Sequence, residues 1–161
     1  MLDEPVNIVW LKRDLRTLDH AVLDAAEKVC QPYLIIYVFE PELMQHADSS
    51  LRHWQFIYHS IQEMNQNLAK FNRQVVIFHA DAFEVFQYLI EQLPFKKVYS
   101  HRESGVRLTW DRDKHIRQLF NNNSIDWIEF KRDGIERGIH NRDGWNTIRI
   151  MTKINELSVP F

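Results

Sequence analysis

Short apolar runs alternate with longer amphipathic segments along most of the chain. The apolar runs have the length and the β-branched and aromatic composition of strands, and they cover residues 6–11, 33–39, 74–79, 97–101 and 125–130. The run at 33–39 is apolar throughout, which is typical of a strand that helices cover on both faces.

The amphipathic segments between these runs predict four helices. Asp19 is expected to cap the first, which continues to about residue 29, with Leu18 and Val22 placed for a hydrophobic staple. Asp81 is expected to cap the third, which ends near residue 93, and the fourth covers 109–121. The second helix covers 50–71, where apolar side chains recur every three or four positions: Trp54, Ile57, Ile61, Met64 and Leu68.

This alternation of strands and helices predicts an α/β fold with a five-stranded parallel, doubly wound, Rossmann-like sheet. Strands joined through helices run parallel, and their crossovers are right-handed. The first strand is expected to lie between the second and the fourth, so the loops that follow these three converge. Because such sheets bind ligands at the carboxyl ends of their strands, the loops 12–16, 40–44 and 102–105 form the predicted site.

The pattern changes after residue 131, so the α/β domain is expected to cover 1–131. The segment 132–161 contains three of the four glycines, Gly134, Gly138 and Gly144. We interpret it as an excursion followed by the start of an interdomain linker.

The sequence lacks the motifs of several enzyme classes. No glycine precedes Gly105, which excludes a G-x-G-x-x-G turn or a P-loop after the first strand. No His, Cys, Asp or Glu cluster has zinc spacing, and no G-x-S-x-G elbow occurs. The sequence therefore predicts neither a catalytic residue nor a metal ligand in this chain.

Composition and charge bear on DNA binding, on the redox compartment and on membrane association. The net charge of -2 gives no basic excess of the kind that DNA-binding surfaces show. The single cysteine, Cys30, excludes an internal disulfide and favours a reducing cytoplasm. No apolar run approaches the roughly 20 residues that cross a bilayer, so no membrane partner is expected.

Three motifs carry a resemblance to the DNA photolyase/cryptochrome flavoproteins, bacterial deoxyribodipyrimidine photolyases among them. The segment 10–16 reads W-L-K-R-D-L-R and is similar to the family's W-x-R-R-D-L-R, with Lys12 where arginine is usual. The helix beginning at Arg52 resembles R-x-x-F-L-x-x-S-L, and the segment 101–113 resembles H-x-E-[ST]-G-x-x-x-T-x-x-R-D. A segment at 134–145 is similar to the approach to the linker in some bacterial members.

The resemblance implies an N-terminal domain whose FAD-binding helical partner domain is absent from this chain. In the full proteins, light-excited reduced FAD donates an electron to a pyrimidine dimer or (6-4) product in damaged DNA, a carbon-carbon lyase reaction. Cryptochromes use the same flavin for signalling. The α/β domain holds an antenna chromophore in many members: a folate, a deazaflavin, FMN or a ribityl-lumazine. The alternatives are a cryptochrome-type blue-light sensor without repair activity and a free-standing nucleotide-binding α/β module.

Seven residues at the strand ends are the candidates for holding such a chromophore. Arginines suit a phosphate, carboxylate or ring carbonyl, carboxylates accept from hydroxyl or ring N–H groups, and aromatic rings form walls. The candidates are Arg13, Asp14, Phe39, Glu40, Arg52, His101 and Glu103. For four of the polar candidates a plainer role stays open: ion pairs at the strand ends for Arg13 and Asp14, a backbone hydrogen bond for His101 and a solvated loop acid for Glu40. Arg52 and Arg112 are expected to hold these charged side chains in position for a ligand.

Overall fold

The computed structural model describes residues 5–131 of the 161-residue chain. The predicted excursion and linker over 132–161 therefore lie outside the described residues.

The described residues form one five-stranded, all-parallel sheet, as the sequence predicts. Its strands are β1 (Asn7–Leu11), β2 (Tyr33–Phe39), β3 (Val75–His79), β4 (Lys97–His101) and β5 (Asp126–Phe130). The strand order is β3-β2-β1-β4-β5, so β1 lies between β2 and β4. In this register Ile8 pairs with Leu34 on one side and with Val98 on the other.

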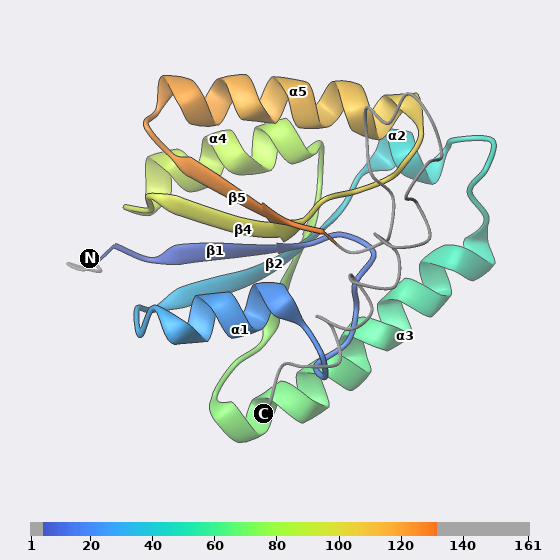
Figure 1. The fold of residues 1–161 in the computed structure, drawn as a ribbon. Coiled ribbons are helices and arrows are strands. Elements are labelled where there is room, and N and C mark those ends of the chain that lie inside the picture. Colours follow the sequence, from blue (N-terminus) through green and yellow to red (C-terminus); the bar gives the residue numbers. More distant parts are fainter. Residues whose placement is uncertain (1–4, 132–161) are drawn as a thin grey trace, which may run out of the picture. The chain divides into compact units, whose positions relative to one another are not determined.

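Helices cover both faces of the sheet, α4 and α5 on one and α1 and α3 on the other (Figure 1). Their bounds are α1 (Ala21–Lys28), α2 (Pro41–Met44), α3 (Leu51–Leu68), α4 (Ala82–Gln92) and α5 (Arg107–Asn122). A 3-10 turn, Ala69–Phe71, extends α3. The short helix α2 is not predicted by the periodicity because it makes only one turn, which Pro41 begins. Within residues 5–131, no helix combines the length and apolar character that crossing a bilayer requires.

The core consists of two apolar layers, one on each face of the sheet. Ile36 and Val38 of β2 belong to the layer under α4 and α5, where Phe86 and Phe120 are fully buried. Tyr37, and the partly buried Phe39 beside it, belong to the layer under α1 and α3. This division follows from the two-residue period of a strand, which sends neighbouring side chains to opposite faces.

Two of the predicted helix starts agree with the structure. Ser50 caps α3 by accepting from His53 N, and Asp81 caps α4 by accepting from Phe83 N at 2.7 Å. The fourth helix begins at Arg107, two residues before the predicted Thr109.

The predicted start of the first helix is wrong. His20, not Asp19, is the N-cap of α1, and its Nδ1 accepts from Leu23 N. Asp19 has a φ of 51°, a left-handed conformation that lets the chain turn into the helix. Leu18 is 70% exposed and forms no staple with Val22.

The helix α3 is buried only in its second half. Ile61, Met64 and Leu68 are buried as predicted, whereas Trp54 and Ile57 are half-buried. Phe56 is 72% exposed, so the first half of α3 contributes little to the core.

Candidate functional site

The carboxyl ends of β1, β2 and β4 bring three loops together, because β1 lies between the other two strands. Lys12 and Arg13 follow β1, Glu40 follows β2, and Glu103 lies just beyond β4. Arg112 reaches this point from the second turn of α5. These residues form what we call the carboxyl-edge network: Lys12, Arg13, Glu40, Glu103, Arg112 and Asp113.

Arg112 is the centre of the carboxyl-edge network. Its side chain is 9% exposed, and it pairs with Glu40 at 2.6 Å and with Glu103 at 2.7 Å. Its Nε and Nη2 also donate to Asp113, at 3.0 and 2.8 Å. Although burial opposes the charge, the carboxylates of Glu40, Asp113 and Glu103 raise the pKa of Arg112, so it stays a cation. One guanidinium therefore holds three carboxylates from three separate segments.

Two further cations complete the carboxyl-edge network. Lys12 donates to Asp113 at 2.9 Å, and its Nζ lies 4.3 Å from the centre of the Trp10 ring. Burial lowers the pKa of Lys12, against the opposing pull of Asp113. Arg13 is about half exposed and donates to Glu103 at 2.9 Å. The three cations match the three carboxylates in charge. This pairing is what makes the burial of Arg112, Glu40 and Glu103 tolerable.

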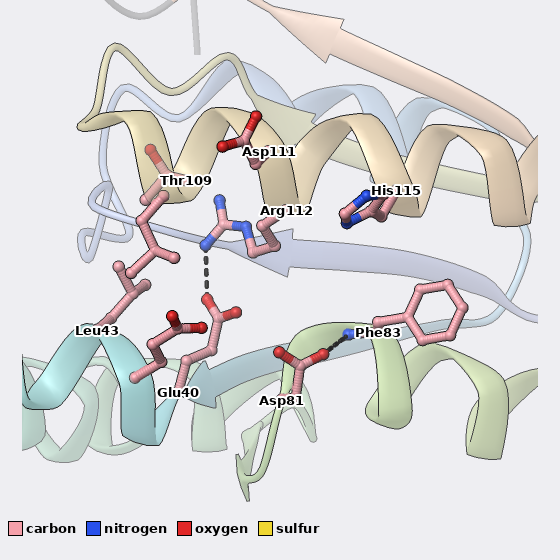
Figure 2. A pocket seen from close by; sticks show the side chains of 10 residues that line it. Glu40, Leu43, Asp81, Phe83, Thr109, Asp111, Arg112 and His115 are labelled. Atoms are coloured by element: carbon pink, nitrogen blue, oxygen red, sulfur yellow. Dashed lines mark hydrogen bonds and ion pairs between the residues drawn. The ribbon is translucent and has the colours of Figure 1, made fainter.

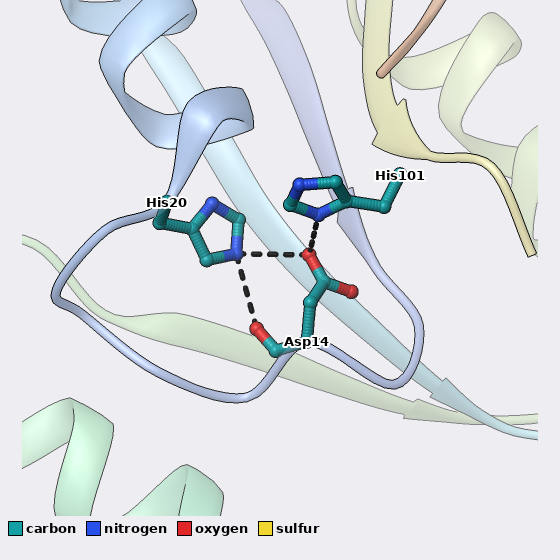
Figure 3. A group of neighbouring side chains, drawn as sticks. All are labelled: Asp14, His20 and His101. Carbon is teal, nitrogen blue, oxygen red and sulfur yellow. Dashed lines mark hydrogen bonds and ion pairs between the residues drawn. The ribbon is translucent and has the colours of Figure 1, made fainter. Parts of the chain in front are cut away.

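Asp14 belongs to a second, separate cluster (Figure 3). Its carboxylate Oδ2 lies 2.5 Å from Nδ1 of His101 and 2.8 Å from Nε2 of His20. Its Oδ1 accepts from the Lys12 backbone N–H. Although burial raises the pKa of Asp14, the hydrogen bonds from His101 and His20 outweigh that effect and hold it well below its usual value. The carboxylate ties the ends of β1 and β4 to the start of α1.

The same three side chains lie within the reach of a single metal ion, but their hydrogen bonds are unfavourable for one. His20 Nδ1 accepts from Leu23 N, so the ring proton of a neutral His20 is on Nε2, the atom that faces Asp14. A metal ion would need the lone pair of that nitrogen, which requires moving the proton to Nδ1 and breaking the cap of α1. We therefore interpret Asp14, His20 and His101 as a structural cluster.

A pocket of about 170 Å³ lies beside the carboxyl-edge network, bounded by α2, the start of α4 and the first half of α5 (Figure 2). Arg112 forms part of its wall, together with the ion pair to Glu40. The other lining residues are Glu42, Leu43, Asp81, Phe83, Leu108, Thr109, Asp111 and His115.

The structure brings five of the seven predicted residues to the carboxyl edge, in two groups. Arg13, Glu40 and Glu103 belong to the carboxyl-edge network, while Asp14 and His101 form the structural cluster with His20. Of the seven, Glu40 alone lines the described pocket.

The other two predicted residues belong to neither group and do not line the pocket. Phe39, the last residue of β2, faces the α1 and α3 layer, 6.0 Å from the ring of Trp54, because its strand neighbour Val38 faces the α4 and α5 layer. Arg52 is exposed in the first turn of α3.

Sequence reasoning assigned Arg112 a supporting role and missed several of its neighbours. Asp113 was visible in the R-D pair that ends the third motif. His20 had no signal beyond its place next to the expected cap. The pocket residues Glu42, Asp111 and His115 had none, because the pocket depends on where α2 and α5 pack.

Comparisons with known proteins place residues 7–135 in a family model described as DNA photolyase. A deoxyribodipyrimidine photo-lyase of Vibrio cholerae is 29% identical over 130 residues, which cover 78% of this chain and 27% of that protein. A cryptochrome DASH of Synechocystis is 25% identical and matches 62% of this chain and 21% of its own length. The chain thus spans 15–27% of the length of the curated relatives it matches.

Solved structures share the fold. An archaeal photolyase from Sulfolobus tokodaii, described with two FAD molecules and the implication of a novel light-harvesting cofactor, gives a TM-score of 0.74 at 20% identity, over 91% of this chain and 35% of its own. A bacterial class III photolyase from Agrobacterium tumefaciens gives 0.73 at 22% identity, over 89% and 30%.

Proposed function

This chain belongs to the DNA photolyase family, with the α/β fold of its N-terminal domain, and we propose that it holds a light-harvesting chromophore for a photolyase-like flavoprotein. The chromophore occupies the carboxyl edge of the sheet. The same unit packs on a C-terminal FAD-binding domain, and the whole protein carries out light-driven repair of pyrimidine dimers in the cytoplasm.

The observation that carries this proposal is the coincidence of a pocket and a buried charge network at the carboxyl edge. Three loops and α5 supply polar side chains that are held rigidly, with Arg112 bridging Glu40 and Glu103. A chromophore that only absorbs and passes on light needs an enclosed slot and fixed hydrogen bonds, without bond-making residues. Parallel α/β sheets bind their ligands at this edge.

The dimensions of the pocket fit part of a chromophore. Ligand pockets commonly enclose about 300–1,000 Å³. The pocket beside Arg112 has about 170 Å³, which accommodates one small ring system and leaves any chain attached to it outside. The archaeal relative is described with two FAD molecules and the implication of a novel light-harvesting cofactor, which supports an antenna in this fold.

A cryptochrome-type light sensor without repair activity is the second candidate. Cryptochromes appear among the relatives beside photolyases, including a chicken cryptochrome-2 that is 23% identical over 53% of this chain. Both candidates use the same α/β unit. They differ in the flavin domain, so the antenna proposal applies to either.

Titration of the full chain with candidate chromophores tests the antenna proposal. Folate, a deazaflavin, FMN and a ribityl-lumazine are each followed by fluorescence. We expect one class to bind and Glu103→Ala to weaken its binding by about 1–3 kcal/mol, because Glu103 does not line the pocket itself but holds Arg112, which does, through a buried hydrogen bond. Arg13→Ala is expected to have a smaller effect in the same direction, because Arg13 is half exposed. Arg117→Ala, which removes the exposed pair with Glu129, is the control and should leave binding unchanged.

Tight binding that neither substitution alters would place the chromophore elsewhere, and no binding of any class would refute the antenna proposal. A light-dependent repair assay on this chain tests the division of labour. We expect no dimer reversal, because the flavin chemistry is assigned to the partner domain, and measurable reversal would contradict that assignment.

A further inference from the structure

Neighbouring helices on one face of the sheet carry opposite charges. The helices α2 and α4 contain three glutamates, Glu42, Glu84 and Glu91, and neither a lysine nor an arginine. All three glutamates are exposed, and we call them the acidic column. Beside them, α5 contains four lysine and arginine residues against two aspartates. We call its exposed Arg107 and Lys114 the basic column.

The charges on α4 and α5 have the same spacing. Glu84 and Glu91 are seven residues apart on α4, as are Arg107 and Lys114 on α5, and seven residues rise about 10 Å over two helical turns. Each pair therefore lies on one side of its helix. The Arg107 side chain is 94% exposed, and its ion pair with Asp111 is long, at 3.7 Å, so it is free to turn to another carboxylate.

The pocket beside Arg112 shows how the two columns are aligned. Helices α4 and α5 run side by side in the same direction (Figure 1). Phe83 and His115 line the same pocket, so their chain neighbours Glu84 and Lys114 lie at the same level along the helices.

The other end of the pocket places α2 beside the first turn of α5. Leu43 and Thr109 lie on the same side of the pocket (Figure 2), so Glu42 lies level with Arg107. Between the two columns the lining is partly apolar, with half-buried side chains of Leu43, Phe83 and Leu108. An apolar centre with charges around it is the usual anatomy of a protein interface.

A face with one acidic and one basic column is complementary to a copy of itself. A nucleic acid or an acidic protein would be repelled by the acidic column, and a basic partner by the basic column. A two-fold axis that runs parallel to the helices, above the seam between α4 and α5, exchanges the columns of two copies. Rotation about this axis leaves each charge at its own level.

We propose that this face is an interface between two copies of the chain, with α4 of each copy stacked on α5 of the other. Glu84 then faces the partner's Lys114, and Glu42 faces the partner's Arg107. The two-fold axis repeats both contacts and brings the apolar seams together at the centre. This interface goes beyond the proposed function and does not depend on whether a chromophore binds.

Sedimentation equilibrium of the full chain tests the proposal. The concentration series extends to about 1 mM, because small and polar interfaces associate weakly. We expect a monomer–dimer equilibrium whose dissociation constant rises at least about tenfold between about 0.05 and 0.5 M salt, where the ion pairs are screened.

Charge reversals connect the dimer to this face. Glu84→Lys and Lys114→Glu each place like charges opposite one another, and each should weaken the dimer at least about tenfold. Both residues are exposed, so the fold should persist, which circular dichroism checks. An equimolar mixture of the two variants restores opposite charges at both contacts and should dimerise about as tightly as the wild type. The control is Glu63→Lys, the same charge change at an exposed position of α3, which should leave the dimer intact.

Four outcomes would overturn the proposal. A wild-type chain that stays monomeric at the highest concentration leaves this face to a different partner. A dimer that neither Glu84→Lys nor Lys114→Glu weakens forms through another surface. A mixture of these variants that stays monomeric shows that the two positions do not meet across the interface. Equal weakening by Glu63→Lys would reduce the effect to net charge.

Discussion

Replacing Arg112 by methionine is predicted to be the most damaging single change at the carboxyl edge. Methionine keeps the length of the side chain without the charge. The guanidinium is 9% exposed and bridges Glu40 and Glu103, whose side chains are 7% and 5% exposed. Removing it leaves these two carboxylates buried with less compensation, whereas Asp113 keeps its pair with Lys12.

Breaking a buried ion pair by removing one partner typically costs about 3–5 kcal/mol, and we expect Arg112→Met to lower the free energy of unfolding by that amount at pH 7. Arg107→Met is the matched control, on the same helix. The Arg107 side chain is 94% exposed, and its ion pair with Asp111 is long, at 3.7 Å. Its removal should therefore cost about 0–0.5 kcal/mol.

The cost of Arg112→Met should depend on pH. Burial already raises the pKa of Glu40 above its ordinary 4.5, and losing Arg112 raises it further. An acid whose pKa is higher in the folded state destabilises that state above this pKa, and the penalty disappears as pH falls towards the unfolded value. The gap between the variant and the wild type should therefore shrink from pH 7 to pH 4.

Urea unfolding followed by circular dichroism at pH 7, 5.5 and 4 measures this gap. Adding Glu40→Gln to the variant should recover part of the loss, since a neutral amide is cheaper to bury than an unpaired carboxylate. A loss below about 1 kcal/mol at pH 7, or one that grows as the pH falls, would refute the electrostatic reasoning.

Three further substitutions probe the core, the Asp14 cluster and the turn before α5. Phe86→Ala should lower the free energy of unfolding in urea by about 3–5 kcal/mol because the ring is fully buried. The control Tyr88→Ala, on the same helix, should lower it by less than about 1 kcal/mol because Tyr88 is 54% exposed. Equal losses would contradict the argument from burial. Asp14→Asn should lose about 1–3 kcal/mol at pH 7. Because the folded pKa of Asp14 is depressed, the stability difference between the wild type and this variant should narrow as pH falls below the ordinary value of 3.8. A difference that stays constant down to pH 2 would contradict this role of the Asp14 carboxylate. Gly105→Ala should cost about 1–3 kcal/mol because a Cβ there collides with Thr109 Oγ1, and the double variant with Thr109→Ala should recover stability; no recovery would mean that the collision is not the cause.

The sequence determined the fold because its signals are local and repeated. Each strand has a contiguous apolar run, and the structure places β2 over the same residues 33–39 that the pattern predicts. Alternation with helices then required parallel strands, and the position of β1 between β2 and β4 is the one expected for a doubly wound sheet. The family followed from dense motifs at the strand ends.

The sequence did not decide which of two neighbouring residues caps the first helix. Asp19 and His20 both accept hydrogen bonds, and the choice between them depends on the turn that brings the chain to α1. Asp14 also binds the ring of His20, so a contact outside the helix favours the histidine as the cap.

The tertiary structure alone decided how the candidate site is divided. Arg112 meets Glu40 across 72 positions and Lys12 meets Asp113 across 101, so no local pattern reveals these pairs. The fold also placed Phe39 in the α1 and α3 layer, away from the pocket that Glu40 lines. Buried charges must find partners wherever the packed chain supplies them, and that search is made in three dimensions. Which groups remain to meet a ligand is therefore a property of the folded chain.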